Sequence, residues 1–307
     1  MLRYALRRIA GAIPTLFIIV TISFFMIRLA PGGPFDRERS VPAEIEAQLR
    51  QTYHLDEPLV VQYGRYLGRL FHGDFGPSFK YKDFTVNELI WQGFPVSLKL
   101  GGAAIVLATL LGLAAGSLAA LRQNSVVDYA VMATAMTGIA IPNFVMAPLL
   151  TLIFGLYLSL LPVGGWGDGG IAPAVLPVTA LALPQVAAIA RLTRGSMIEV
   201  LRSNYVRTAR AKGLPERITI LRHAVKGALL PVVSYLGPNI ANIITGSVVI
   251  EQIFGLPGIG RYFVQAALNR DYTLVMGVVI FYGVLIILLN LVVDLIYGWL
   301  DPKIRYD

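Results

Sequence analysis

The segment from Leu98 to Leu121, LKLGGAAIVLATLLGLAAGSLAAL, decides the fold class of this chain. It holds 24 residues and a single charged side chain, Lys99. An α-helix rises about 1.5 Å per residue, so this segment can form a helix about 36 Å long, and the hydrocarbon core of a bilayer is about 30 Å thick. The segment is therefore predicted to cross a membrane as a helix.

Five further apolar stretches of similar length occur along the chain. Alternating ten-residue segments, which are typical of membrane β-barrel strands, are absent from the sequence. We therefore predict an all-α polytopic membrane protein with six transmembrane helices. The predicted spans are Ile9–Leu29, Leu98–Leu121, Tyr129–Leu161, Val175–Leu192, Leu229–Ile250 and Leu274–Trp299.

The composition supports a membrane protein and excludes several other classes. Of the 307 residues, 56% are hydrophobic and 14% are charged, against roughly a quarter charged in an ordinary soluble domain. Cysteine is absent, which excludes disulfides and thiolate metal sites. The three histidines, His54, His72 and His223, are too scattered to form a zinc site. We therefore expect no metal site in this chain.

Basic side chains predict the orientation, because short loops rich in Lys and Arg stay on the cytoplasmic side. The net charge is +8, and in so apolar a chain it points to cytoplasmic loops and not to a nucleic-acid partner. With the N-terminus inside, the cytoplasmic segments hold 15 basic residues, and the two short outer loops hold only Arg261 and Arg270. Both termini are therefore predicted to be cytoplasmic, with the first span an uncleaved anchor.

The residues between the first two spans, 30–97, are too many and too charged for a simple turn, with nine acidic side chains among them. Apolar residues at helical spacing follow Pro58, which suits the first turn of a helix. Thr85 and Glu88 form a capping-box pattern before another short helix. We predict a small periplasmic subdomain at 30–97, preceded by the N-terminus and first span at 1–29 and followed by a core of the remaining five spans at 98–307.

The cytoplasmic segment 193–227 is predicted to contain a short helix with a fixed stop. Ser203 and Asn204 can cap a helix whose body is Tyr205–Lys212, and Gly213 supplies a left-handed residue that ends it. Pro215 can then begin a second helix. That second helix is predicted to have an apolar face made of Ile218, Leu221, Ala224 and Val225.

Two interpretations fit this basic segment. Polybasic helices bind anionic headgroups, at about 1 kcal/mol per basic residue near the surface. The alternative is docking into an acidic groove of a cytoplasmic protein. The sharp break at Gly213 favours docking, because adhesion to lipid requires no fixed elbow.

The chain also lacks the residues that would power transport by itself. The centres of the spans are almost free of ionisable side chains, which argues against ion coupling and against an intramembrane enzyme. A standard ATP-binding loop requires Gly-Lys, and none of the six lysines follows a glycine. Any ATP that drives transport must therefore be hydrolysed by another subunit.

Two stripes of residues predict how the spans pack. Small residues at four-residue spacing in the second span allow close helix packing. Polar residues in the fifth span either line a pathway or form interhelical hydrogen bonds, and Pro142 with Asn143 could mark a kink at a cavity. The small stripe is Ala104, Ala108, Gly112, Gly116 and Ala120, and the polar stripe is Tyr235, Asn239, Asn242 and Gly246.

The segment Asn204–Pro215, NYVRTARAKGLP, resembles the coupling loop of permease subunits in ATP-binding-cassette importers of the peptide family. In such importers the pattern is Glu-Ala-Ala, three residues, glycine, nine residues and Ile-x-Leu-Pro. Here Arg207, Thr208 and Ala209 stand in the first three places, and Gly213 matches the glycine.

Later positions depart from that pattern in the way of the peptide-transporter variant, because His223 stands in place of the isoleucine and Leu230-Pro231 comes late. Three other stretches, Leu2–Gly32, Gly73–Asp83 and Ile250–Gly260, also resemble the B-type permease subunits of oligopeptide importers. The resemblance thus covers nearly the whole chain.

This resemblance implies a type I importer permease in a bacterial inner membrane that moves oligopeptides inward. It implies a homologous second permease, two cytoplasmic ATPases that bind ATP and magnesium, and a periplasmic peptide-binding protein, with no cofactor in this chain. The alternative is the same architecture carrying dipeptides, nickel or another small solute. The ATPase-coupling residues would be Asn204, Tyr205, Arg207, Thr208, Ala209, Arg210, Lys212, Gly213 and Leu214.

Two further sets of residues are candidates within that architecture. The translocation pathway is predicted to include Asn143 and the polar stripe residues Tyr235, Asn239 and Asn242. A turn near the outer mouth, either a gate or a plain connector, is predicted at Glu251, Gly255, Pro257 and Gly258.

Overall fold

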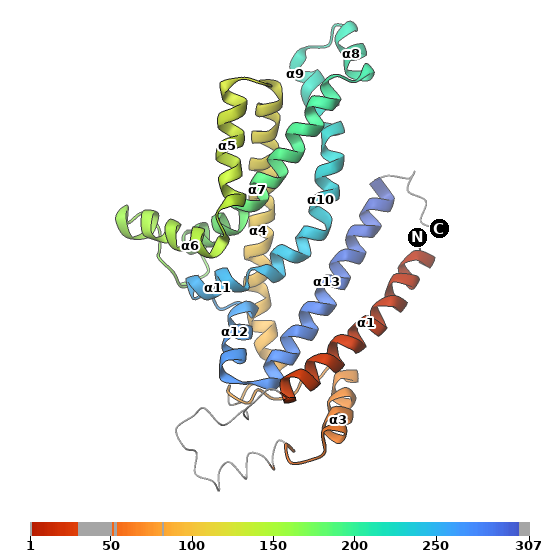
Figure 1. Cartoon of the computed structure of the whole chain (residues 1–307), viewed down its shortest axis with the longest axis vertical. Helices are drawn as coiled ribbons and strands as arrows, with labels where there is room; N and C mark the ends of the chain where they lie inside the picture. Colours follow the sequence, from red (N-terminus) through yellow and green to blue (C-terminus); the bar gives the residue numbers. More distant parts are fainter. Residues whose placement is uncertain (1, 30–50, 52–53, 82, 301–307) are drawn as a thin grey trace. The chain divides into compact units, whose positions relative to one another are not determined.

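The computed structural model describes residues 2–29, 51, 54–81 and 83–300, and it is nearly all helical (Figure 1). Most of the first part of the predicted periplasmic subdomain, residues 30–50, 52 and 53, lies outside the described residues, as do residue 82 and residues 301–307. Apart from helices, the described ranges contain one isolated bridge, between Pro77 and Thr85.

The described helices follow one another along the chain in a fixed order. They are α1 Leu2–Leu29, α3 Leu59–Phe71, α4 Val86–Leu121, α5 Val126–Ala140, α6 Asn143–Leu150, η1 Thr151–Tyr157, α7 Ile171–Leu201, α8 Asn204–Ala211, α9 Glu216–Ile218, η2 Thr219–Ala224, α10 Val225–Gly246, α11 Val248–Phe254, α12 Ile259–Asn269 and α13 Tyr272–Leu300.

Five helical stretches of the described chain are long and apolar enough to cross a membrane, and a sixth span is possible if one bent pair counts as a span. This confirms the prediction of an all-helical membrane protein. The predicted third span, Tyr129–Leu161, is not one straight helix, because α5 and the α6–η1 stretch meet at an angle of 107°. Ile141 is extended (φ −100°, ψ 119°), as expected for a residue that precedes a proline, so Pro142 ends α5 instead of merely kinking it.

One other helix, α4, is longer than the sequence suggests. The capping box is present, with the Thr85 amide donating to Glu88 at 2.8 Å, but the helix that it starts is α4, which runs on without a break to Leu121. The prediction of a separate short helix before Leu98 is therefore wrong. The apolar residues of this first part of α4 are buried against α12 and α13, which supports the extra turns.

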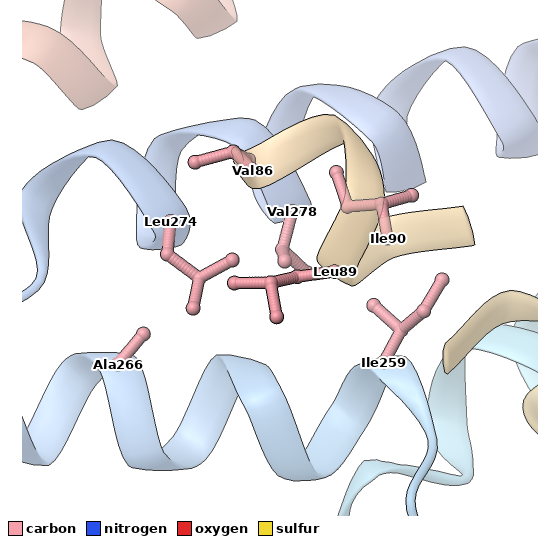
Figure 2. Packing of buried hydrophobic residues seen from close by; sticks show 7 residues of the cluster. All are labelled: Val86, Leu89, Ile90, Ile259, Ala266, Leu274 and Val278. Carbon is pink, nitrogen blue, oxygen red and sulfur yellow. The ribbon is translucent and has the colours of Figure 1, made fainter. Parts of the chain in front are cut away.

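The chain forms two compact units. The first comprises the described residues within 1–96 and 257–291, and the second comprises the described residues within 97–256 and 292–300. In the first unit, the start of α4 packs with α12 and α13 around a core that contains no polar side chain (Figure 2). That core is Val86, Leu89, Ile90, Ile259, Ala266, Leu274 and Val278.

A buried carboxylate organises the loop that precedes α4. Asp271 lies just before α13 and is fully buried, and it accepts a hydrogen bond from the Leu274 amide at 3.1 Å, which caps the helix. The same carboxylate accepts hydrogen bonds from the Ser78 hydroxyl and from the Phe79 amide at 3.2 Å. The loop is thus fixed to the N-terminal end of α13.

In the second unit, α7 is the central helix and is in contact with α5, α6, α10 and α11 (Figure 1). Its contact with α4 is so close that side chains would not fit. A Cβ atom added at Gly116 would lie 2.4 Å from the carbonyl oxygen of Ala190, and one at Gly112 would lie 2.7 Å from the side chain of Ile189. The small residues of the stripe therefore allow α4 and α7 to pack closely, as predicted.

An ion pair joins α5 to α7 in the same unit. Asp128 is 1% exposed, and both of its oxygens accept hydrogen bonds from the Arg194 guanidinium, at 2.6 Å each. The Asn124 amide donates a third at 2.9 Å. This two-point geometry fixes the orientation of both side chains as well as their distance.

Alanine substitutions at two glycines of α4 distinguish the effect of close packing on stability from the effect of helix propensity. We expect Gly116→Ala to lower the stability of the purified protein by about 1 to 3 kcal/mol, because the added methyl group overpacks a backbone contact. The measurement is thermal unfolding in detergent. Gly102→Ala on the same helix is the control, because no atom lies within 4 Å of its added Cβ, and it should be neutral or stabilising by up to about 1 kcal/mol. Equal effects of the two substitutions would contradict close packing at Gly116.

Candidate functional site

The short helix predicted in the cytoplasmic segment is present as α8, Asn204–Ala211. It begins one residue before the predicted body, and Lys212 is its C-terminal cap. Ser203 occupies the N-cap position without capping through its side chain, because its hydroxyl donates to the Val200 carbonyl at 2.6 Å instead. The local signals thus place the helix correctly within one residue.

Only one narrow face of α8 is covered by the rest of the unit. Val206 and Ala209 are buried, three residues apart and so on one side of the helix. The remaining predicted coupling residues are exposed: Asn204, Tyr205, Arg207, Thr208, Arg210, Lys212, Gly213 and Leu214. The helix therefore presents most of its circumference to a partner.

The elbow after α8 depends on the backbone of Gly213. Its φ is +76°, in the left-handed region, and the Leu214 amide donates back to the Ala209 carbonyl at 3.3 Å. This is the ending that glycine favours. Pro215 then occupies the N-cap position of α9, so the predicted stop and restart are both confirmed.

An ion pair bridges the two sides of this elbow. The Arg210 guanidinium donates to both oxygens of Glu216, at 2.7 and 3.1 Å, and this carboxylate raises the pKa of Arg210 above its ordinary value. Both side chains are about half exposed, so the pair contributes little stability. Its effect is to restrict the angle between α8 and α9.

The second helix of the segment differs from the prediction. Between α9 and α10 the chain forms the π-helical stretch η2, Thr219–Ala224. Ala224 is buried as predicted, but Leu221 is 61% exposed and Ile218 43% exposed, whereas Thr219 is fully buried. A π-helix has more residues per turn than an α-helix, so it rotates the side chains that a regular helical pattern would place inward.

A cavity of about 590 Å³ lies beside α8. Its lining includes Tyr205, three side chains at the end of η2 and the start of α10 (Arg222, His223 and Lys226), and apolar residues of α10. A Cβ atom added at Gly227 would lie 2.5 Å from the Tyr205 hydroxyl, so a side chain there would require this tyrosine to shift. The cavity is basic and opens next to the exposed face of α8.

The polar stripe of α10 forms at least one interhelical contact. The Tyr235 hydroxyl donates to Gln185 of α7 at 2.8 Å, and the Asn239 amide group donates to the Tyr235 carbonyl at 2.8 Å. Asn242 is exposed. The interhelical alternative therefore holds for Tyr235, and the assignment of these residues to a pathway stays a prediction.

Asn143 is not on this helix but starts α6, which contacts α7 and α11.

The predicted outer-mouth turn is shorter than expected. Glu251 is fully buried inside α11, and the Ser247 hydroxyl donates to it, so its inclusion in the turn is wrong. The turn itself starts at Gly255, whose φ is +64°, and α12 begins after Gly258, with Pro257 between them. The chain is still helical at Glu251, because α11 continues to Phe254. The sequence pattern did not indicate this helix.

Several structural residues of this region were not singled out from sequence. Gln185 has a hydrogen-bond partner, Tyr235, that is distant in sequence. Glu216 has an ion-pair partner, Arg210, on the other side of the elbow. No local sequence pattern marks either residue. Asp128 and Arg194 each lie just outside a predicted span, so no signal in the sequence indicated that they pair.

The comparisons with known proteins agree with this architecture. Residues 112–306 match the family described as the inner membrane component of binding-protein-dependent transport systems, and residues 1–101 match the N-terminal part of such membrane components. The chain belongs to this family of transport-system permeases.

Individual relatives match over the full length. The chain is 60% identical over 306 residues to the oligopeptide transport system permease protein OppB of Escherichia coli K12, with 100% of both chains covered, and 56% identical to OppB of Haemophilus influenzae, again with 100% of both covered. It is 46% identical to the dipeptide transport system permease protein DppB of Bacillus subtilis, over 99% of this chain and 98% of that one.

A solved structure also shares the fold. A chain of an amino acid ABC transporter, crystallised with histidines, superimposes with a TM-score of 0.52 at 18% identity, covering 68% of this chain and 93% of that chain.

Replacing the elbow glycine should loosen the end of α8. We expect Gly213→Ala to speed hydrogen exchange of the amides at residues 209–216, because a left-handed conformation costs a residue with a Cβ about 1 to 2 kcal/mol. Gly213→Asn should have a smaller effect, since asparagine tolerates this conformation. Gly195→Ala in α7 is the control, because its backbone is helical and no atom lies within 4 Å of the added Cβ. Unchanged exchange in Gly213→Ala would show that the elbow does not depend on this conformation.

Proposed function

We propose that this chain is a membrane-spanning permease subunit of an ATP-driven importer that moves oligopeptides from the periplasm to the cytoplasm. The observation that carries the proposal is the 60% identity, over the whole length of both chains, to permeases named for oligopeptide transport. The match to permeases named for dipeptide transport is weaker, at 46% identity, so dipeptides are the second candidate. Nickel or another small solute is a more distant alternative.

The proposed mechanism assigns α8 to the ATPase. The exposed face of α8 sits in a groove of one ATPase, and closure of the ATPase pair on ATP and magnesium moves it as a lever. Val206 and Ala209 anchor the helix to its own unit, and the pair Arg210–Glu216 limits flexing at the elbow. ATP then drives transport because it binds the two conformations of the complex with different affinities.

The proposed assembly contains a homologous second permease, two ATPases and a periplasmic peptide-binding protein. The chain lies in the bacterial inner membrane with both termini in the cytoplasm. That orientation is supported by the basic residues of segment 193–227 and by their scarcity in the outer loops. It places α8 on the side where ATP is available.

Charge reversal on the exposed face of α8 tests the coupling role. We expect Arg207→Glu to reduce copurification of the ATPases by about tenfold or more, because like charges that face each other across an interface cost several kcal/mol. Arg122→Glu is the matched control, since Arg122 is exposed and lies outside segment 193–227. Normal copurification of the ATPases with Arg207→Glu would refute docking through this face.

Arg210 requires a different design, because it is paired with Glu216. The exchange Arg210→Glu with Glu216→Arg keeps an ion pair at the elbow while it reverses the charge on α8. Loss of ATPase binding in both Arg210→Glu and the exchange variant indicates direct docking. Recovery in the exchange variant indicates that Arg210 acts only through the elbow.

Uptake identifies the cargo. In a strain that lacks this chain, we expect loss of labelled pentapeptide uptake and full recovery on complementation. Labelled dipeptide and nickel are measured in parallel. Loss of dipeptide or nickel uptake with normal pentapeptide uptake would keep the architecture but refute oligopeptides as the cargo.

A further inference from the structure

A cavity of about 180 Å³ lies in the first unit, between α1, α3 and the start of α13. Its lining includes Phe24 and Arg28 of α1, Tyr66 and Arg69 of α3, and Tyr272 of α13. A single water needs only about 10 to 15 Å³ on the same measure. The cavity therefore has room for a group of several heavy atoms.

Two of the arginines at this cavity have no acidic partner among the described residues. Arg28 donates a hydrogen bond to the neutral side chain of Gln62, and its guanidinium carbon lies 5.3 and 5.8 Å from the ring centres of Phe24 and Tyr272. Within the described part of the chain, no carboxylate forms an ion pair with Arg28 or Arg69.

The acidic residues nearby are engaged elsewhere. Glu57 pairs with Arg65 at 2.7 Å and with His54 at 3.2 Å. Asp271 accepts hydrogen bonds from Ser78 and from backbone amides. Within the part of the chain that the structure describes, the cavity thus combines positive charge that no carboxylate compensates with an aromatic wall.

Two buried hydrogen-bond donors at the same place are also unsatisfied. Tyr66 is 9% exposed, and its hydroxyl is buried without a hydrogen-bond partner among the described residues, as is the Nε atom of Arg28. Burial raises the pKa of Tyr66 well above its ordinary value, so the hydroxyl keeps its proton. Buried donors without partners are rare in folded proteins and indicate a missing acceptor.

An apolar groove also lies between α1 and α3. It has a volume of about 200 Å³, and side chains of Ile13, Phe17 and Val20 on α1 and of Leu67 and Phe71 on α3 line it. Phe71 is 86% exposed and Ile13 65% exposed, as expected for side chains that face lipid. From Ile13 to Arg28 the helix rises about 22 Å, more than half the thickness of a hydrocarbon core of about 30 Å.

We infer that the cavity and the groove together bind an anionic phospholipid. The phosphate lies in the cavity, where Arg28 and Arg69 supply charge and the Tyr66 hydroxyl and Arg28 Nε donate hydrogen bonds. An acyl chain follows the groove between α1 and α3. Charge-assisted hydrogen bonds of this kind are stronger than neutral ones, and an apolar groove between the same two helices favours a lipid over a free anion. The inference does not depend on the substrate that the protein transports.

Lipid titration followed by native mass spectrometry tests this site in the intact transport complex in detergent. The ligands are dioleoyl phosphatidylglycerol, dioleoyl phosphatidylcholine, glycerophosphoglycerol and inorganic phosphate. We expect phosphatidylglycerol to bind about tenfold more tightly than phosphatidylcholine, in line with the strength of one hydrogen bond to a charged group. Glycerophosphoglycerol, which has no acyl chains, should bind more weakly than the lipid. Inorganic phosphate that binds as tightly as phosphatidylglycerol would overturn the lipid assignment in favour of a free anion.

Two variants with matched controls locate the binding. Arg69→Gln should weaken phosphatidylglycerol binding about tenfold. The control Arg122→Gln removes one exposed charge elsewhere and should not change this binding. Tyr66→Phe deletes a hydroxyl that has no partner in the protein, so it should fold normally and weaken phosphatidylglycerol binding severalfold. The control Tyr157→Phe alters an exposed tyrosine. Equal binding of the two lipids, or equal effects of each variant and its control, would overturn the assignment.

Discussion

The contact between α4 and α7 is the constraint on which the second unit depends. At Gly112 and Gly116 the backbone of α4 lies against α7, with no room for a side chain. Without a hydrophobic driving force inside a bilayer, such close packing is a main source of helix association. Because α7 also contacts α5 and α10, fixing its position fixes the helices around it. Its C-terminal end leads directly into α8, so the place of the coupling segment follows from a packing contact deep in the unit.

Polar interactions then fix the rotation of the helices about their own axes, which packing alone does not determine. Asp128 and Arg194 hold α5 to α7 through two parallel hydrogen bonds, and Tyr235 with Gln185 joins α10 to α7. In the first unit, Asp271 caps α13 and holds the loop before α4. Each of these groups would be costly to bury alone, so each determines which neighbour its helix can have.

The elbow at Gly213 and the cavity of the first unit differ in their energetic cost to the folded protein. At the elbow, the left-handed backbone is compatible with glycine, so the sharp turn costs little and α8 projects with most of its surface exposed. In the cavity, the Tyr66 hydroxyl and Arg28 Nε are left without partners, which is a cost that a bound anionic group would remove.

The sequence by itself determined the elements and the kind of protein. The length of the apolar runs predicts spanning helices, the small stripe predicts close packing, and Gly213 with Pro215 predicts the elbow, because each of these effects acts within a few residues of the chain. Only the tertiary structure decided the positions at which the chain departs from its local sequence pattern. Pro142 turns one predicted span through 107°, η2 rotates Leu221 outward, and Glu251 lies inside α11 instead of in the following turn. The partners of Arg194, Tyr235 and Arg28 are likewise distant in sequence, and a single sequence carries no signal for which distant residues meet.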